Sequence, residues 1–138
     1  FLKYDFDKKE CLPCAYIMSD CNDLKEVNDS FGHAMGDIYI QEIAKMLEQY
    51  VPKNGLCIRW GGDEILMILP NCHEDHCREI IGKINEAQKI KRKKLPYMEI
   101  AVGYHIRKTI KQPEKEAIQL ADQNMYADKK KRKMAEWK

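Results

Sequence analysis

The sequence lacks any run approaching the roughly 20 apolar residues of a membrane span, so no membrane-spanning helix is expected. A basic and then apolar secretory leader is also missing, and we therefore expect an intracellular protein. Only 7 glycines and 5 prolines occur among 138 residues, which excludes collagen-like, elastomeric and disordered chains. The 44% of hydrophobic and 33% of charged residues instead describe a single globular domain with an ordinary core.

The cysteines allow three interpretations: a disulfide framework, a zinc site or plain reduced thiols. The six are Cys11, Cys14, Cys21, Cys57, Cys72 and Cys77. Because two of them lie inside apolar segments and no leader is evident, we expect reduced thiols. Cys11-x2-Cys14 together with Cys72-x3-His76-Cys77 is the zinc alternative, although neither half has regular finger or ribbon spacing.

The charge is small overall and uneven along the chain. Residues 89–94 and 129–133 each carry five positive charges, whereas the net charge is only +2, so the remainder is acidic. This distribution suits a polyanionic ligand that cations bind at one place and a metal ion at another. The alternative is a solvated surface, which we favour for residues 89–94.

Hydrophobic periodicity predicts four strands and four helices. We expect strands at residues 15–19, 56–59, 65–69 and 97–106, and helices at 23–31, 36–50, after Asn71 and after Pro113. Asn71 and Glu74 are expected to form a capping box, and Pro113 to open the last helix.

The order β-α-α-β-β-α-β-α predicts an α/β fold of the α+β sandwich type. It is a ferredoxin-like β-α-β-β-α-β core with extra helices, in which helices pack on one side of a mostly antiparallel central sheet. The first strand and the hairpin at residues 56–69 are expected to be neighbours in the centre. Since no repeat or linker is evident, residues 1–138 are expected to form one domain.

Two aspartates are expected to meet at one end of this sheet. Asp20 follows the first predicted strand, and Asp63 lies at the tip of the hairpin beside Gly61 and Gly62. Two carboxylates, with glycines that let a ligand approach the backbone, suit Mg²⁺ bound through substrate phosphates. The alternative is a pair of ordinary turn aspartates.

The segment between the first strand and the long helix suits a nucleotide. It leads from a strand into a helix, where free backbone N–H groups favour phosphate. Asn28 and Asp37 add an amide and a carboxylate, which match the hydrogen-bonding edge of guanine. Taken singly, each residue could instead be a helix cap or a surface group.

Three blocks of the sequence resemble the GGDEF family of diguanylate cyclases. They are Arg59-Trp-Gly61-Gly62-Asp63-Glu64-Ile65, the segment Asp20-x4-Lys25-x2-Asn28-Asp29-x2-Gly32-His33-x2-Gly36-Asp37, and Ala121-Asp122-x2-Met125-Tyr126-x2-Lys129. The blocks come in the family's order and span nearly the whole chain. Ile65 stands where the signature ends in Phe, and Asn22 replaces a residue that is often acidic. The family's usual opening segment, Asp-x-Leu-Thr-Gly-Leu-x-Asn-Arg, is absent, and we therefore expect a fragment of a longer sensory protein.

The resemblance implies a fold akin to nucleotide cyclases and the polymerase palm. It implies Mg²⁺-dependent condensation of two GTP into cyclic di-GMP and two pyrophosphates, with Mn²⁺ as a substitute ion. By position, Asp20, Asp63 and the backbone carbonyl of Cys21 would bind the metal, and Asp63 and Glu64 would be catalytic. Residues that would bind GTP are Asp23, Leu24, Lys25, Asn28, Asp37, Gly61, Gly62, Lys129 and Lys133.

The resemblance also implies partners and a location. Two domains would meet face to face as a homodimer, under control of an upstream sensory domain. We expect a cytoplasmic domain without nucleic-acid or membrane contact of its own, even where the parent protein is membrane-anchored. Many family members bind their product at an Arg-x-x-Asp pair before the glycines. Here that stretch is Pro52-Lys-Asn-Gly55, so tight product binding there is not expected.

Two alternatives to an active cyclase remain open. One is a degenerate GGDEF domain that binds GTP as a regulatory module without catalysis. The other is a nucleic-acid module that uses the basic runs. Against this second alternative, the basic runs have no aromatic residues interleaved with the cations. It also gives no role to the acidic residues at the end of the first strand and at the tip of the hairpin.

Overall fold

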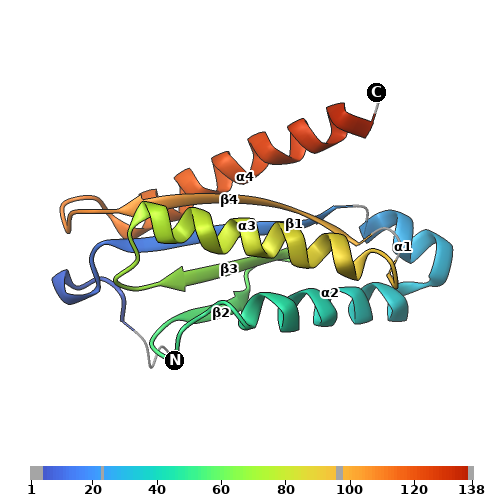
Figure 1. Cartoon of the computed structure of the whole chain (residues 1–138), viewed down its shortest axis with the longest axis horizontal. Coiled ribbons are helices and arrows are strands. Elements are labelled where there is room, and N and C mark those ends of the chain that lie inside the picture. The colour runs from blue at the N-terminus through green and yellow to red at the C-terminus, as the bar shows by residue number, and fades with distance from the viewer. Residues whose placement is uncertain (1–4, 23, 96–97, 137–138) are drawn as a thin grey trace.

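The computed structural model describes residues 5–22, 24–95 and 98–136 (Figure 1). In chain order the elements are a short 3-10 helix η1 (Lys9–Cys11), β1 (Cys14–Asn22), α1 (Leu24–Phe31), α2 (His33–Glu48), β2 (Leu56–Arg59), β3 (Glu64–Leu69), α3 (Glu74–Lys91), β4 (Glu99–Arg107) and α4 (Glu114–Glu136).

The strands form one antiparallel sheet in the order β2-β3-β1-β4. β1 is central, and Asp20 lies opposite Glu64 of β3 on one side and Ala101 of β4 on the other. The predicted α+β fold and the central position of β1 beside the hairpin are therefore confirmed.

The prediction that helices cover one side of the sheet is wrong. Ala15 and Ile17 of β1 belong to the core beneath α2 and α3, whereas Tyr16 and Met18 belong to a second core beneath α4. Figure 1 shows α4 apart from α2 and α3, with the sheet between them. Successive side chains of a strand point to opposite faces, and those of β1 and β3 are apolar on both, so both faces need a cover.

Several element boundaries differ from their predictions. β1 continues past Ser19 to Asn22, because Asp20 and Asn22 are buried and paired with β4. The helix predicted at 36–50 begins earlier, at His33. The start of the predicted strand at Tyr97 and that of the predicted helix at Asp23 lie outside the described residues.

The predicted capping box before α3 is also wrong. His73 precedes the first helical residue, and no side chain caps this end. Asn71 has a left-handed backbone (φ 53°), and its amide donates to the carbonyl oxygen of Glu10 at 2.8 Å. Because the Asn71 side chain makes this hydrogen bond, it does not form the predicted capping box.

Gly103 lets α4 lie directly against β4. A Cβ at Gly103 would be 1.9 Å from the backbone nitrogen of Met125. Two hydrogen bonds fix the contact: the Asn124 amide donates to the Tyr104 carbonyl at 2.8 Å, and the Val102 N–H donates to Asp128 at 2.9 Å. In the part of the chain that the structure describes, no helix has the length and apolar character needed to cross a membrane.

Candidate functional site

The loop between β2 and β3 holds Asp63 against β1. The Trp60 N–H donates to the carbonyl of Glu64 at 2.8 Å, and the Arg59 guanidinium Nε donates to the carbonyl of Gly62 at 3.0 Å. The N–H of Cys21 donates to the backbone carbonyl of Asp63 at 2.9 Å. The hairpin tip is thus joined to β1 one residue after Asp20, and the structure brings the two predicted metal-binding aspartates together.

Asp20 is a buried carboxylate whose charge is only partly compensated. Its side chain faces α4, and Lys129 Nζ lies 3.3 Å from its Oδ2 atom. Its other oxygen, Oδ1, is buried and has no hydrogen-bond partner among the described residues. Burial, followed by the charge of Asp63, raises the pKa of Asp20, while Lys129 lowers it. An acidic pair of this kind suits an added cation.

A divalent ion fits this donor set only with ligands from outside the protein. Among the described residues, no group of three or more His, Cys, Asp or Glu side chains is arranged to hold a metal ion. Asp20 and Asp63 supply hard carboxylate oxygens, and substrate phosphates and waters commonly complete the octahedral shell of Mg²⁺. The residues present therefore fit an ion whose remaining ligands are phosphate oxygens and water. The carbonyl of Cys21 remains a predicted ligand.

Glu64 and Asp122 form a second pair of carboxyl groups beside the first. Burial raises the pKa of Glu64, and the charges of Asp122 and Asp20 raise it further. Both Glu64 and Asp122 line a cavity of about 500 Å³, together with Met18, Trp60 and Ile118. The sequence motif contained Asp122, but its proximity to Glu64 became visible only when α4 was placed on the sheet.

The two lysines predicted to contact phosphate lie on α4. Lys129 reaches Asp20, and Lys133 lies one helical turn further on and is exposed. Arg132 anchors this part of α4, because it bonds Asp128 at 2.8 Å and the Asn85 side chain of α3 at 2.9 Å.

The residues predicted to recognise guanine lie on α1 and α2. Asn28 Oδ1 is buried without a hydrogen-bond partner among the described residues. A Cβ on Gly36 would be 1.9 Å from that oxygen, so the glycine leaves the room that the amide needs. Asp37 is exposed in the second turn of α2, and no described contact joins it to Asn28.

The other predicted nucleotide contacts are near the start of α1 and in the hairpin loop. Leu24 is half-buried, and Lys25 is exposed in the first turn of α1. Gly62 is exposed, whereas Gly61 is half-buried beneath the Glu64 side chain. Asp23, predicted to contribute backbone groups to phosphate, lies outside the described residues.

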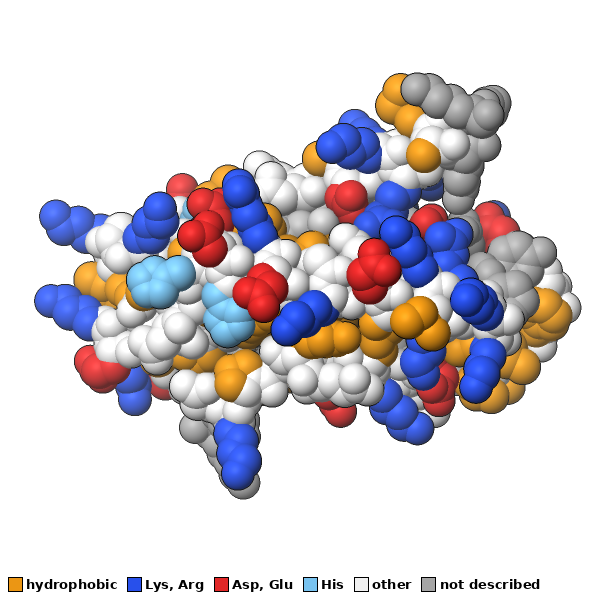
Figure 2. All heavy atoms as spheres, in the orientation of Figure 1, with side chains coloured by type: hydrophobic (Ala, Val, Ile, Leu, Met, Phe, Trp, Pro, Cys, Tyr) orange, Lys and Arg blue, Asp and Glu red, His pale blue; other side chains and the backbone are white. Residues whose placement is uncertain are grey.

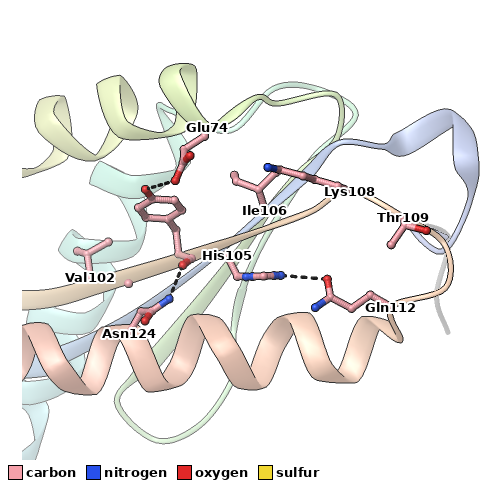
Figure 3. Close-up of a pocket in the computed structure, with 10 residues that line it drawn as sticks. Glu74, Val102, His105, Ile106, Lys108, Thr109, Gln112 and Asn124 are labelled. Atoms are coloured by element: carbon pink, nitrogen blue, oxygen red, sulfur yellow. Dashed lines mark hydrogen bonds between the residues drawn. The ribbon is translucent and has the colours of Figure 1, made fainter.

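A larger cavity, of about 700 Å³, lies along the outer edge of β4 (Figure 3). Several of its polar side chains are bonded within the protein: the Tyr104 hydroxyl donates to Glu74 at 2.8 Å, and His105 Nε2 lies 3.0 Å from Gln112 Oε1. Asn124 donates to the Tyr104 carbonyl. We therefore place the candidate site at the carboxylates rather than in this cavity.

The cysteines form no second site. All six are free thiols, as expected. Burial raises the pKa of Cys14 and of Cys77 to about 12, as expected for thiols inside a core. Among the described residues, no three or more His, Cys, Asp or Glu side chains are grouped so that they could hold a metal ion. The zinc alternative therefore has no support among the described residues.

The antiparallel sheet, its flanking helices and the glycine-rich acidic hairpin define a domain of the nucleotide cyclase class. More particularly, the chain belongs to the GGDEF family of diguanylate cyclases, since the family model described as "Diguanylate cyclase, GGDEF domain" matches residues 3–135. This confirms the family inferred from the sequence motifs.

Curated relatives agree with this assignment. The chain is 26% identical over 129 residues to Diguanylate cyclase A of Treponema denticola, covering 89% of this chain and 34% of that protein. It is 32% identical over 129 residues to Diguanylate cyclase DgcN of Escherichia coli, covering 86% and 30%. The chain thus spans about a third of the length of these relatives.

The fold is also that of a solved GGDEF domain. The GGDEF domain of DgcB from Caulobacter crescentus, solved in complex with c-di-GMP, matches with a TM-score of 0.77 and 22% identity, covering 85% of this chain and 72% of that chain. At this level of identity the likeness shows the fold alone.

Proposed function

We propose that this domain condenses two molecules of GTP into cyclic di-GMP and releases two pyrophosphates. The observation that carries the proposal is the buried Asp20 carboxylate, whose Oδ1 has no described partner while Asp63 and Lys129 lie beside it. Such a carboxylate is costly to bury without a ligand, and a divalent ion delivered with a triphosphate would compensate it. The diguanylate cyclases among the relatives support the same reaction.

The reaction requires groups that act on a triphosphate. In each half-reaction, the ribose 3′ oxygen of one GTP forms a bond to the α-phosphorus of the other. The bond from that phosphorus to the bridging oxygen breaks, and pyrophosphate leaves. Asp20 and Asp63 would hold Mg²⁺ or Mn²⁺, and the bound ion would neutralise charge and acidify the attacking hydroxyl. The nearby Glu64 is the candidate proton acceptor.

Lys129 and Lys133 are proposed to stabilise the leaving pyrophosphate. Without substrate, Lys129 pairs with Asp20, and an ion at the carboxylates would free its ammonium for the phosphates. Lys133 is on the same helical face and exposed, so both cations can bind one triphosphate.

Guanine selectivity is proposed to come from Asn28 and Asp37. Asn28 offers a buried amide oxygen without a described partner, which a guanine donor would satisfy. A site built to hydrogen-bond one base leaves such groups unpaired with another base, which disfavours ATP. Leu24, Lys25, Gly61 and Gly62 complete the proposed GTP site.

Each proposed site holds one GTP, so the reaction needs two domains facing each other. We propose a homodimer of GGDEF domains in the active state, controlled by a sensory domain elsewhere in the parent protein. We also propose a cytoplasmic location for the domain, where GTP and Mg²⁺ are available.

The test is incubation of the chain with GTP and Mg²⁺ over a range of protein concentrations. We expect cyclic di-GMP and pyrophosphate in a ratio of one to two, with turnover per domain rising with protein concentration as pairs form. Asp63→Asn should make no product while keeping the wild-type circular dichroism spectrum. GTP binding without product at any concentration would instead identify the degenerate, regulatory type of GGDEF domain.

A further inference from the structure

The fold brings the two basic runs of the sequence together. Residues 89–94 comprise the end of α3, at Lys91, and the three residues after it, whereas residues 129–133 lie near the end of α4. The two helices pack on opposite faces of the sheet. Both ends reach the outer edge of β4, and in Figure 2 blue side chains gather around them, with a few red ones among them. We call residues 89–94 and 129–134 the basic surface.

A buried carboxylate joins the two runs. Glu99, at the start of β4, lies 3.3 Å from a guanidinium nitrogen of Arg92 and 3.7 Å from one of Arg132. The Glu99 side chain is 10% exposed, so one protected anion holds a cation from each helix. The juxtaposition is therefore part of the fold rather than a chance approach of two flexible side chains.

Most of the remaining cations in the basic surface are not neutralised. Lys93, Lys94 and Lys131 are exposed and make no ion pair with any residue that the structure describes. Lys130 lies over the Tyr126 ring, 5.7 Å from its centroid, and keeps its charge. A surface of this kind attracts a polyanion over several ångströms.

The basic surface also carries two exposed apolar side chains. Ile90 is 66% exposed and Met134 is 68% exposed, the highest values among the large hydrophobic residues that the structure describes. Each basic run thus has one apolar side chain beside its lysines. Ile90 lies between Lys89 and Lys91 in the first run, and Met134 follows Lys133 at the end of the second. Exposed aliphatic side chains set among lysines are typical of proteins that bind at a lipid headgroup layer.

We propose that the basic surface docks this domain onto an anionic lipid bilayer. Lys93, Lys94 and Lys131, which have no described ion pair, would lie at the headgroups. Ile90 and Met134 would insert into the boundary with the acyl chains, and Lys129 and Lys133 would stay with the proposed GTP site. This differs from the absence of membrane contact expected from the sequence, which could not show that the runs meet. A nucleic-acid surface fits less well, because the two exposed apolar side chains of the basic surface are Ile90 and Met134, and neither has a ring that could stack on a base.

The experiment is co-sedimentation of the full chain with vesicles of phosphatidylcholine containing 30% phosphatidylglycerol, compared with pure phosphatidylcholine. Binding is expected only to the anionic vesicles and should fall when NaCl is raised to 0.5 M, since screening weakens charge attraction. Lys93→Gln/Lys94→Gln should lower the partition coefficient roughly 30-fold, about fivefold for each lysine. Ile90→Ser/Met134→Ser should weaken binding while leaving its salt dependence in place.

The matched control is Lys8→Gln/Lys9→Gln, which removes the same charge from exposed lysines outside the basic surface. Wild-type affinity of this control would support the proposal, and an equal loss would overturn it in favour of a general charge effect. Absence of binding to anionic vesicles would also overturn it. So would binding to a 20-nucleotide single-stranded RNA that is at least as tight as vesicle binding at the same salt concentration. None of these outcomes depends on cyclase activity.

Discussion

Gly103→Ala is expected to push α4 away from the sheet. The added methyl would be 1.9 Å from the nitrogen and 2.5 Å from the Cα atom of Met125, and these are backbone atoms that cannot rotate away. Ordinary van der Waals contact begins near 3.4 Å, so α4 would have to move away from β4 by about 1.5 Å. Overpacking of this kind costs about 1–3 kcal/mol. The two hydrogen bonds that fix α4 to β4 would be strained as well.

Both stability and activity should report this shift. For a chain of 138 residues we expect Tm to fall by roughly 5–10 °C, on the basis of a cost near 2 kcal/mol. Because α4 carries Lys129, cyclase activity should fall by about 100-fold at temperatures where the variant remains folded.

Gly82→Ala provides the matched control for this substitution. A Cβ at Gly82 meets nothing within 4 Å, and the position lies inside α3, so alanine should raise stability by about 0.5–1 kcal/mol. Thermal denaturation followed by circular dichroism measures both variants. If Gly103→Ala were as stable and as active as the wild type, the close packing of α4 on β4 would be wrong.

The remaining predictions concern the nucleotide and metal sites. Asn28→Ala should weaken GTP binding much more than ATP binding, and Gly36→Ala should act alike by displacing the amide; equal losses for both nucleotides in calorimetry would indicate a purely structural role. Asp20→Asn should abolish synthesis yet stabilise the metal-free protein. Folded Asp20 holds its proton more tightly than unfolded Asp20, so its charge becomes unfavourable to folding as pH rises above 3.8. In urea denaturation between pH 4 and 7, the free energy of unfolding of Asp20→Asn should exceed that of the wild type by an amount that grows with pH. A wild type that is the more stable of the two at pH 7 would refute this prediction. Cyclic di-GMP should not bind tightly at residues 52–55, and micromolar binding localised there, with the active site filled by a GTP analogue, would contradict this.

The parts of the fold that local patterns determine could be predicted from the sequence. The strand Leu56–Arg59 lies where its apolar run predicted, because tight turns and alternating strands leave a local signal. β1 was predicted too short, since Asp20 and Asn22 resemble strand-ending residues until the sheet that buries them is known. Which face α4 covers was not predictable either, because periodicity shows that a helix has an apolar face but not what that face meets.

In the candidate site, too, the features that could be predicted are local in the sequence, and the others depend on packing. The signature glycines and Asp63 are contiguous, so the sequence alone indicated them. The proximity of Asp122 to Glu64, and the room that Gly36 leaves for Asn28, depend on how separate elements pack. Arg132 and Glu99 show this most clearly, because they are distant in the chain and meet only when α3 and α4 reach the same edge of β4.

The central claim is that Asp20 and Asp63 form a divalent cation site that is completed by the nucleotide. Manganese binding followed by electron paramagnetic resonance, with a non-hydrolysable GTP analogue present, tests it most directly. The wild type should bind Mn²⁺ only when the analogue is present, and Asp20→Asn and Asp63→Asn should each lose that binding. Asp75→Asn, which removes an exposed carboxylate from α3, should bind as the wild type does. Undiminished Mn²⁺ binding by both site variants would contradict the account.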